Sequence, residues 1–156
     1  MKMDISIGDN ARREISQSLK AVLGDTYVLY LKTHGFHWNV VGPRFAQLHS
    51  LFETQYRDLW DTLDAVAERI RSLGELAPNS GSEMQKAASL KEVPAEPHSD
   101  MDMIKALLAD NEAIIKTVHK AFDSAEKGGD QATMDLMVER LSYHEKTAWM
   151  LRAHLG

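Results

Sequence analysis

Apolar residues recur every three or four positions over four long stretches of the chain, which is the period of an amphipathic helix. This pattern predicts helices over residues 10–37, 43–73, 99–127 and 130–154, and no stretch alternates with the period of a half-buried strand. The expected inward-facing positions are Ile15, Leu19, Val22, Leu23, Leu29 and Tyr30; Phe45, Leu48, Phe52, Leu59, Leu63, Val66, Ile70 and Leu73; Ile104, Leu107, Leu108, Ile115, Val118 and Phe122; and Leu136, Leu141, His144, Ala148 and Leu151.

Glycine and proline mark the boundaries of these predicted helices. Residues 39–42 form a short break before Pro43, which suits the first position of the second helix. Gly74 is a natural stop for that helix, and the pair Gly128-Gly129 separates the last two helices. The first two and the last two helices are therefore expected to form tight hairpins.

The connection over residues 74–99 is much longer and contains three prolines. Within it, the sequence Ser-Glu-Met-Gln at 82–85 has the pattern of a capping box, so we expect a short helix that opens there and fades near Glu92. Two hairpins joined by one long crossover indicate a four-helix bundle of the ferritin-like type. We therefore predict an all-α fold with a short extra helix in the crossover, and a single domain over residues 1–156 with a tail at about 1–9.

Composition narrows the class of protein further. The 156 residues, 44% hydrophobic and 26% charged, are ordinary for one globular domain. The chain has no cysteine, which excludes disulfides, thiolate metal sites and cysteine nucleophiles. No apolar run approaches the ~20 residues of a membrane-spanning helix, and the first residues lack the apolar core of a signal peptide. These features predict a cytoplasmic protein.

The net charge of the chain is −5 with histidine neutral. The only basic clusters are the pair Arg12-Arg13 and Arg69 with Arg71. Nonspecific DNA binding through phosphate contacts is therefore not what the composition favours.

A second stripe of residues runs beside the apolar stripe of the second predicted helix. It consists of His49, Glu53, Trp60, Asp64 and Glu68. His49 and Glu53 are four residues apart and can converge on one ion, and so can Asp64 and Glu68. Imidazole and carboxylate ligands without thiolates suit iron(II), manganese or zinc.

The two pairs lie too far apart to share an ion within one helix, because His49 and Asp64 are separated by ~22 Å along its axis. An antiparallel copy of the same helix removes this difficulty. The pairs His49–Glu68 and Glu53–Asp64 are both centred between residues 58 and 59, so a two-fold axis at that point sets the two members of each pair level across the dimer. Symmetry then creates two identical sites.

His37, at the end of the first predicted helix, completes this arrangement. The chain turns near residue 41, so His37 lies close to the height of His49. Trp60 falls near the two-fold axis, where a large aromatic side chain can be buried between the sites. The predicted metal site takes ligands from two chains: His37, His49 and Glu53 from one, and Asp64 and Glu68 from the other.

The same features also have plain structural explanations. Two carboxylates four residues apart on a helix are usually a solvated face, and Trp38 and Trp149 are most simply packing residues. His144 is expected to be a hydrogen-bonded core residue. No Glu-x-x-His motif of the kind used by intrachain ferritin sites is present, which favours a site shared between chains. The remaining histidines are expected to be structural or on the surface: His34, His98, His119 and His154.

Residues 37–70 resemble a known family in the sequence HWNVVGPRFAQLHSLFETQYRDLWDTLDAVAERI. That family is Dps, the DNA-binding proteins from starved cells, also called mini-ferritins. The sequence HEKTAWMLRAHL at 144–155 is similar to the C-terminal pattern of the same family. The resemblance covers essentially the whole chain, including the short helix expected in the crossover.

The resemblance extends to the predicted metal ligands. The spacing of His37, His49, Asp64 and Glu68 matches the ferroxidase centre that Dps proteins form between subunits. Glu53 falls on the fifth, acidic position, where Asp is also common in the family. The resemblance thus assigns all five residues to catalysis and to iron binding.

Membership of the Dps family implies a hollow shell of twelve subunits built from two-fold dimers. In the family, Fe(II) enters the shell, is oxidised mainly by hydrogen peroxide, and is stored as a ferric oxide core. Consuming iron and peroxide together suppresses hydroxyl-radical chemistry and so protects the cell and its DNA. Iron, as Fe(II) and Fe(III), is the only cofactor that the resemblance implies, and no membrane partner is expected.

Many Dps proteins also coat DNA, often through a lysine-rich N-terminal tail, and this chain departs from that pattern. Its tail has one lysine, Lys2, which Asp4 and Asp9 offset. Twelve copies with a net charge of −5 would together carry about −60, which repels phosphate. Two alternatives stay open: a nucleoid-associated protein that protects DNA by coating it, and a structural bundle without a metal.

Two further sets of residues are candidates for supporting roles. Trp38 and Trp60, beside the predicted site, are hypothesised to donate electrons to stray oxidants. Acidic residues near the turn between the last two helices are candidates for a threefold iron pore, although a solvated helix end explains them equally well: Asp123, Glu126, Asp130 and Asp135.

Overall fold

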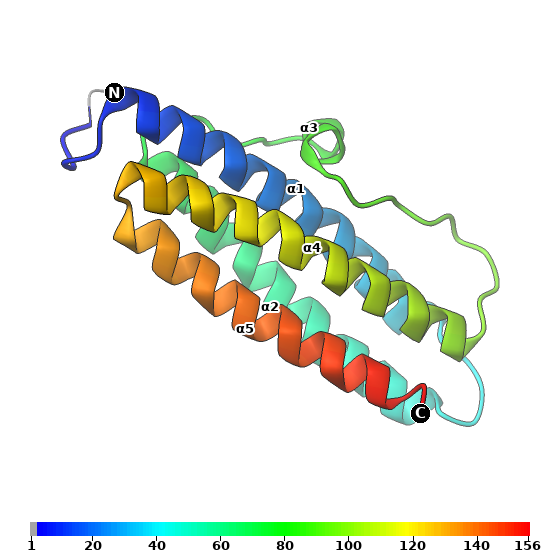
Figure 1. The fold of residues 1–156 in the computed structure, drawn as a ribbon. Helices are drawn as coiled ribbons and strands as arrows, with labels where there is room; N and C mark the ends of the chain where they lie inside the picture. Colours follow the sequence, from blue (N-terminus) through cyan, green and yellow to red (C-terminus); the bar gives the residue numbers. More distant parts are fainter. Residues whose placement is uncertain (1–2) are drawn as a thin grey trace.

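A computed structural model describes residues 3–156 and shows five helices and no strand in that range (Figure 1). The helices are α1 (Asp9–Asn39), α2 (Phe45–Ser72), α3 (Gly81–Ala87), α4 (Asp100–Gly128) and α5 (Gln131–Ala153). The four long helices begin and end within two residues of the predicted bounds. The short helix lies in the crossover as expected, but it ends at Ala87 and not near Glu92. None of the helices over residues 3–156 has both the length and the hydropathy needed to cross a bilayer.

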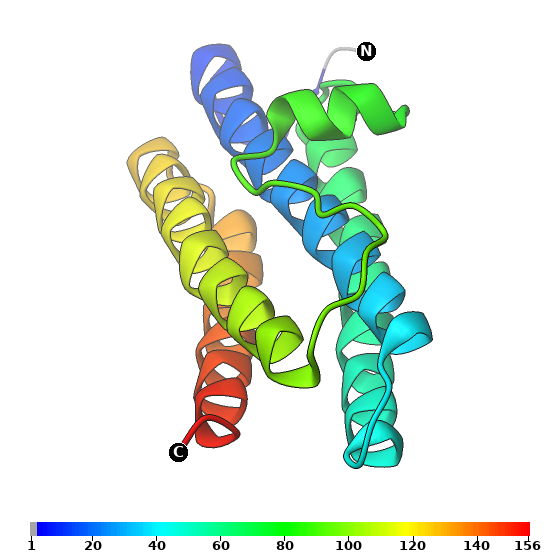
Figure 2. The ribbon, with the colours of Figure 1, turned by 90° about the vertical axis from the view of Figure 1, so that its right-hand side faces the viewer.

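The long helices form two hairpins that pack against each other. α1 packs on α2 and on α4, and α4 packs on α5, so the ferritin-like four-helix bundle is confirmed (Figures 1 and 2). The crossover carries α3 against α1 and then returns the chain to the end of the bundle where α2 began (Figure 2). As a result α2 and α4 run in the same direction. A short turn between them would have made them antiparallel.

The core follows the predicted stripes, but six predicted residues are only partly buried against it: Tyr30, Leu63, Leu108, Phe122, Leu136 and Leu141. Phe45 was expected inside but is 44% exposed, because the first position of α2 lies at the end of the bundle. Ile114 is fully buried in place of the predicted Ile115, and Met137 joins the core from α5. Most of the other predicted positions are buried, including Ile15, Leu19, Leu23, Leu48, Phe52, Leu59, Val66, Ile70, Ile104, Leu107, Val118 and Leu151.

Two predicted helix starts are displaced by two residues. Pro43 lies in the turn before α2, whose N-cap is Arg44, so Pro43 is not the first helical residue. In the crossover, the capping box is formed by Ser80 and Glu83 and not by Ser82. The Ser80 side chain accepts from the Glu83 amide, and the Glu83 carboxylate accepts from the Ser80 amide. The Glu83 carboxylate is a stronger acceptor than the side-chain amide of Gln85, which the expected box would have used. The helix therefore begins at the box that contains Glu83.

The end of α3 is anchored on α1 at Gly24 and Asp25. A Cβ atom on Gly24 would lie 2.6 Å from the Met84 carbonyl oxygen, so only glycine permits this close approach of the two backbones. The fully buried Asp25 carboxylate accepts from the amides of Ser89 and Leu90 at 2.6 and 2.9 Å. The hydroxyl groups of Ser89 and, on α4, of Thr117 donate to the same carboxylate. These bonds fix the crossover across the outside of the bundle.

Candidate metal centre

His37 and His49 lie face to face where the α1–α2 hairpin closes. Their rings are stacked with centroids 3.7 Å apart. The Nδ1 atom of His37 lies 2.7 Å from the carbonyl oxygen of His49, and the Nδ1 atom of His49 lies 2.8 Å from the carbonyl oxygen of His37. This reciprocal pair of bonds joins the end of α1 to the N-terminal part of α2 and orients both rings.

The hydrogen bonds also define which nitrogen of each ring can bind a ligand. A carbonyl oxygen can only accept, so the Nδ1 atoms of His37 and His49 carry the hydrogen and donate it. In an imidazole whose hydrogen is on Nδ1, the lone pair that can bind a metal is on Nε2. Neither Nε2 atom makes a hydrogen bond to another residue of the described chain. A carbonyl bound to the other ring nitrogen is the usual arrangement behind a metal-ligating histidine.

Glu53 lies one turn beyond His49 on α2 and is engaged by Arg57. The Nε and Nη2 atoms of Arg57 donate to Glu53 Oε1 at 2.9 and 2.7 Å. The hydrogen bond from Arg57 lowers the pKa of Glu53 against a smaller opposing effect of burial, and the charge of Arg57 acts in the same direction as the hydrogen bond. Glu53 is therefore an anion close to the histidine pair.

Asp64 and Glu68 continue the same side of α2 and are both exposed. Trp60 is 60% exposed and separates two shallow hollows of this face. One hollow, of about 490 Å³, is lined by Asp64 and by Met84 of α3. Within residues 3–156, no group of three or more histidine and acidic side chains is close enough to hold a metal ion. The chain thus brings His37, His49 and Glu53 to one region and places Asp64 and Glu68 farther along α2.

An aromatic cluster beside the histidine pair was not predicted from the sequence. The His34 ring stacks on the Tyr56 ring with centroids 3.8 Å apart, and its centroid lies 4.2 Å from that of the Trp38 ring. The Nδ1 atom of His34 lies 3.1 Å from the Tyr30 hydroxyl oxygen. The ring centroids of Tyr30 and Trp60 are 5.4 Å apart. Burial lowers the pKa of His34, and the positive charge of Arg57 acts in the same direction. The i,i+4 spacing of these aromatic residues along α1 and α2 was the signal available in the sequence.

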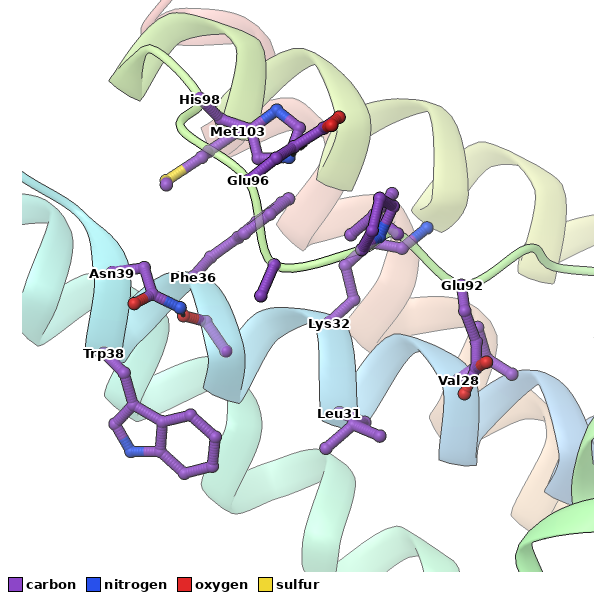
Figure 3. A pocket seen from close by; sticks show the side chains of 14 residues that line it. Val28, Leu31, Lys32, Phe36, Trp38, Asn39, Glu92, Glu96, His98 and Met103 are labelled. Carbon is purple, nitrogen blue, oxygen red and sulfur yellow. Dashed lines mark hydrogen bonds and ion pairs between the residues drawn. The ribbon is translucent and has the colours of Figure 1, made fainter.

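A separate apolar hollow of about 310 Å³ lies between α1 and residues 92–98 of the crossover (Figure 3). Trp38, Phe36 and Met103 contribute to its lining, and His98 has a buried Nε2 atom without a hydrogen-bond partner there. None of the five predicted metal ligands lines this hollow. It is therefore distinct from the candidate metal centre.

The other residues named from the sequence divide into core and surface. His144 is buried as expected, its Nδ1 lies 2.8 Å from Asn111 Oδ1, and burial lowers its pKa to about 3. Trp38 and Trp149 are 61% and 65% exposed, so neither is a core residue of this chain, although Trp38 packs against the His34 ring. Both project from the outer faces of their helices.

The four acidic pore candidates do not share one environment. Asp123, Glu126 and Asp135 are exposed. Asp130 is 1% exposed, caps α5 by accepting from the Thr133 amide, and pairs with Arg69 at 2.7 Å. Asp130 therefore lacks the exposure that a pore-lining residue needs, because its carboxylate is used in the α4–α5 turn.

The N-terminal tail folds back on the bundle. Arg12 donates to the carbonyl oxygens of Ile7 and Leu73, and Gly74 packs against Met3. The single tail lysine, Lys2, lies outside the described residues.

Comparison with known proteins identifies the family to which this fold belongs. The family model for the ferritin-like domain matches residues 16–156. An uncharacterised low temperature-induced protein of Nostoc sp. is 36% identical, covering 99% of this chain and 87% of that protein. The DNA protection during starvation protein of Helicobacter pylori is 36% identical, covering 88% of this chain and 96% of that protein.

A solved structure gives the same result in three dimensions. The Dps protein of Vibrio cholerae, described as a member of a broad superfamily of ferritin-like diiron-carboxylate proteins, superposes with a TM-score of 0.94. It is 29% identical, and the match covers 100% of this chain and 98% of that chain. The chain therefore belongs to the Dps family of ferritin-like proteins.

Proposed function

We propose that this protein is a ferroxidase and iron store, which oxidises Fe(II) mainly with hydrogen peroxide at sites shared between two subunits. The observation that carries this proposal is the reciprocal bonding of His37 and His49, which leaves both Nε2 atoms available beside an anionic Glu53. Two imidazoles and a carboxylate suit iron(II). The Dps family of ferritin-like proteins supplies the context for this chemistry.

The second half of the site is proposed to come from a partner subunit. Asp64 and Glu68 are exposed on α2, and Asp64 lies ~22 Å from His49 along the helix axis. An antiparallel α2 with its two-fold axis between residues 58 and 59 brings Asp64 level with Glu53 of the other subunit, and Glu68 level with His49. The exposed Trp60 then becomes part of the interface.

Each side chain has a defined task in this scheme. The three carboxylates offset the charge of one or two Fe(II) ions, and the two imidazoles supply nitrogen ligands. Five protein ligands leave coordination positions open for peroxide. Reducing one peroxide to water consumes two electrons, so two Fe(II) ions are oxidised without releasing a hydroxyl radical. Trp38 and Trp60, in the aromatic cluster beside the pair, are proposed to donate electrons to stray oxidants.

Storage requires an enclosed space, which we propose is a shell of twelve subunits built from such dimers. Asp123, Glu126 and Asp135 are exposed near the α4–α5 turn and are the proposed lining of a threefold iron pore. DNA coating is the competing assignment. The tail is held against the bundle by Arg12, so plasmid is expected to run unretarded in a gel shift at physiological salt.

The proposal is tested by replacing the two carboxylates assigned to the partner side. The variant Asp64→Ala/Glu68→Ala should slow iron oxidation by peroxide at least about tenfold while the protein still assembles. Glu139→Gln/Glu145→Gln, which removes two exposed carboxylates from α5, is the charge-matched control and should leave the rate unchanged. An unchanged rate in the first variant would refute the site.

A mixing experiment tests whether the site is shared. His37→Ala/His49→Ala and Asp64→Ala/Glu68→Ala protomers are each expected to be inactive alone. When the two are co-expressed, every mixed pair contains one complete site, so about a quarter of the wild-type sites should reappear. If co-expression restores no activity although mixed assemblies form, the two halves do not belong to one site.

A further inference from the structure

Arg57 stands between two carboxylates on the exposed face of α2. Glu53 is one turn before it and Asp61 is one turn after it, so both are within reach of its side chain. In the structure Arg57 donates two bonds to Glu53 Oε1. Asp61 is exposed and lines the same hollow of about 430 Å³ as Arg57. Arg57 thus has a second carboxylate available without any change in the backbone.

The present position of Arg57 conflicts with the proposed role of Glu53. A guanidinium that donates to a carboxylate offsets its negative charge and places a positive charge beside the position of an incoming dication. Like charges a few ångströms apart repel strongly unless solvent screens them. Binding of Fe(II) by Glu53 is therefore favoured if Arg57 moves away.

The energetics of the pair make such a movement easy. The Arg57 and Glu53 side chains are 66% and 40% exposed, and ion pairs at this exposure contribute little to stability. On a helix, an acidic residue placed four residues before a basic one is the better order, so Arg57 prefers Glu53 over Asp61 when no metal is bound. A cation on Glu53 reverses this preference.

We propose that Arg57 is a positioning residue that exchanges Glu53 for Asp61 when Fe(II) binds, and that this exchange sets the metal affinity of the centre. The inference rests on the proposed function, because it assumes that Glu53 is an iron ligand. It assigns a role to Asp61, which is not a ligand itself. Asp61 lowers the free energy of the metal-bound state by accepting the displaced guanidinium.

The test is a double-mutant cycle on metal affinity, measured with Co(II), which binds such sites and can be followed by its absorption spectrum and by calorimetry. Arg57→Gln should tighten Co(II) binding by about 3–10-fold, because the competitor for Glu53 is gone. Asp61→Asn should weaken binding by a similar factor, because Arg57 then stays on Glu53. The double variant should bind like Arg57→Gln alone, since Asp61 acts only through Arg57.

Independent charges would give a different pattern. If Asp61→Asn weakens binding by the same factor with and without Arg57, or if Arg57→Gln leaves the dissociation constant unchanged, the exchange is refuted. Arg57→Lys keeps the charge but loses the two-pronged geometry, and is expected to lie between wild type and Arg57→Gln. A crystal structure with Co(II) should show the Arg57 guanidinium on Asp61, and its retention on Glu53 would contradict the inference.

Failure of the proposed function has a separate signature. If His37→Ala/His49→Ala binds Co(II) as tightly as the wild-type protein, then the histidine pair is not the metal centre, whatever Arg57 does. If that variant loses binding but the cycle is additive, the centre stands and only the exchange is wrong. Arg57 and Asp61 are exposed in the single chain but lie close to the proposed two-fold axis, so size-exclusion chromatography should first show that each variant assembles, and metal affinities are compared between assembled proteins.

Discussion

The Asp25 cluster and the proposed ligand face of α2, which carries Asp64 and Glu68, use the same chemical group in opposite ways. Asp25 is fully buried, and its two oxygens accept from two amides and two hydroxyl groups of the crossover and α4. Asp64 and Glu68 are exposed, and their carboxylates accept no hydrogen bond from the rest of the described chain. The fold uses the acceptor capacity of Asp25, whereas the carboxylates of Asp64 and Glu68 remain open to solvent.

This difference separates stability from metal binding. A buried carboxylate is tolerated only when hydrogen bonds replace its hydration, so Asp25 is indispensable to the crossover. An exposed carboxylate remains hydrated and contributes little to the free energy of folding, so replacing it should affect metal binding more than stability. Substitutions at the two places should therefore give opposite phenotypes.

The largest effect is expected at Asp25. Asp25→Ala leaves the Ser89 and Leu90 amides and the Thr117 hydroxyl without their acceptor, which should lower the free energy of unfolding by about 3 kcal/mol. The measurement is denaturant unfolding at one fixed protein concentration, because assembly also contributes to apparent stability.

Asp25→Asn is the matched comparison for this prediction. The amide oxygen of Asn can still accept from the crossover amides, so the loss should be clearly smaller than for Asp25→Ala. If Asp25→Ala unfolds within about 0.5 kcal/mol of wild type, then the cluster does not hold the crossover, and the contrast with the ligand face disappears.

The second prediction uses the buried His144. Its pKa is about 3 in the folded chain, against about 6.5 in an unfolded one. Below pH 6.5 the unfolded chain therefore binds a proton that the folded chain does not, and stability falls as the pH drops toward 3. Between pH 7 and pH 5 this group alone should remove about 2 kcal/mol.

The variant His144→Gln identifies that contribution. Glutamine can donate to Asn111 as His144 does but does not titrate, so the variant should lose about 2 kcal/mol less than wild type between pH 7 and pH 5. Unfolding curves at the two pH values give the comparison. Equal losses in the two proteins would mean that His144 is not the group responsible.

Much of the fold could be predicted because helix periodicity and glycine stops are local signals. The four long helices required only spacing and the residues at their ends. The errors occurred where tertiary contacts decide. Ile114 replaces Ile115 in the core because packing against α1 and α5 determines which side of α4 is buried. Phe45 is exposed because it is the first residue of α2, at the end of the bundle. The spacing of apolar residues along the chain does not determine either outcome.

The candidate site was only partly accessible from the sequence. Its helical register led to His49, Glu53, Asp64 and Glu68, and the hairpin geometry led to His37. The carbonyl bonds that orient both rings could not be predicted, since they depend on how closely α1 approaches α2. The role of Asp130 was misjudged for a similar reason, because its pairing with Arg69 joins residues 61 positions apart.

The smallest expected effect on the free energy of unfolding is an increase, whereas Asp25→Ala should decrease it. Asp64 has acidic neighbours three residues before it and four residues after it, Asp61 and Glu68, and like charges at these spacings destabilise a helix. Asp64→Asn should therefore raise the free energy of unfolding by about 0.5 kcal/mol while it lowers iron oxidation. Glu145→Gln, which has no acidic neighbour at those spacings, should change neither quantity. If Asp64→Asn destabilises the chain instead, this carboxylate supports the fold, and the ligand face is not separate from the structural core.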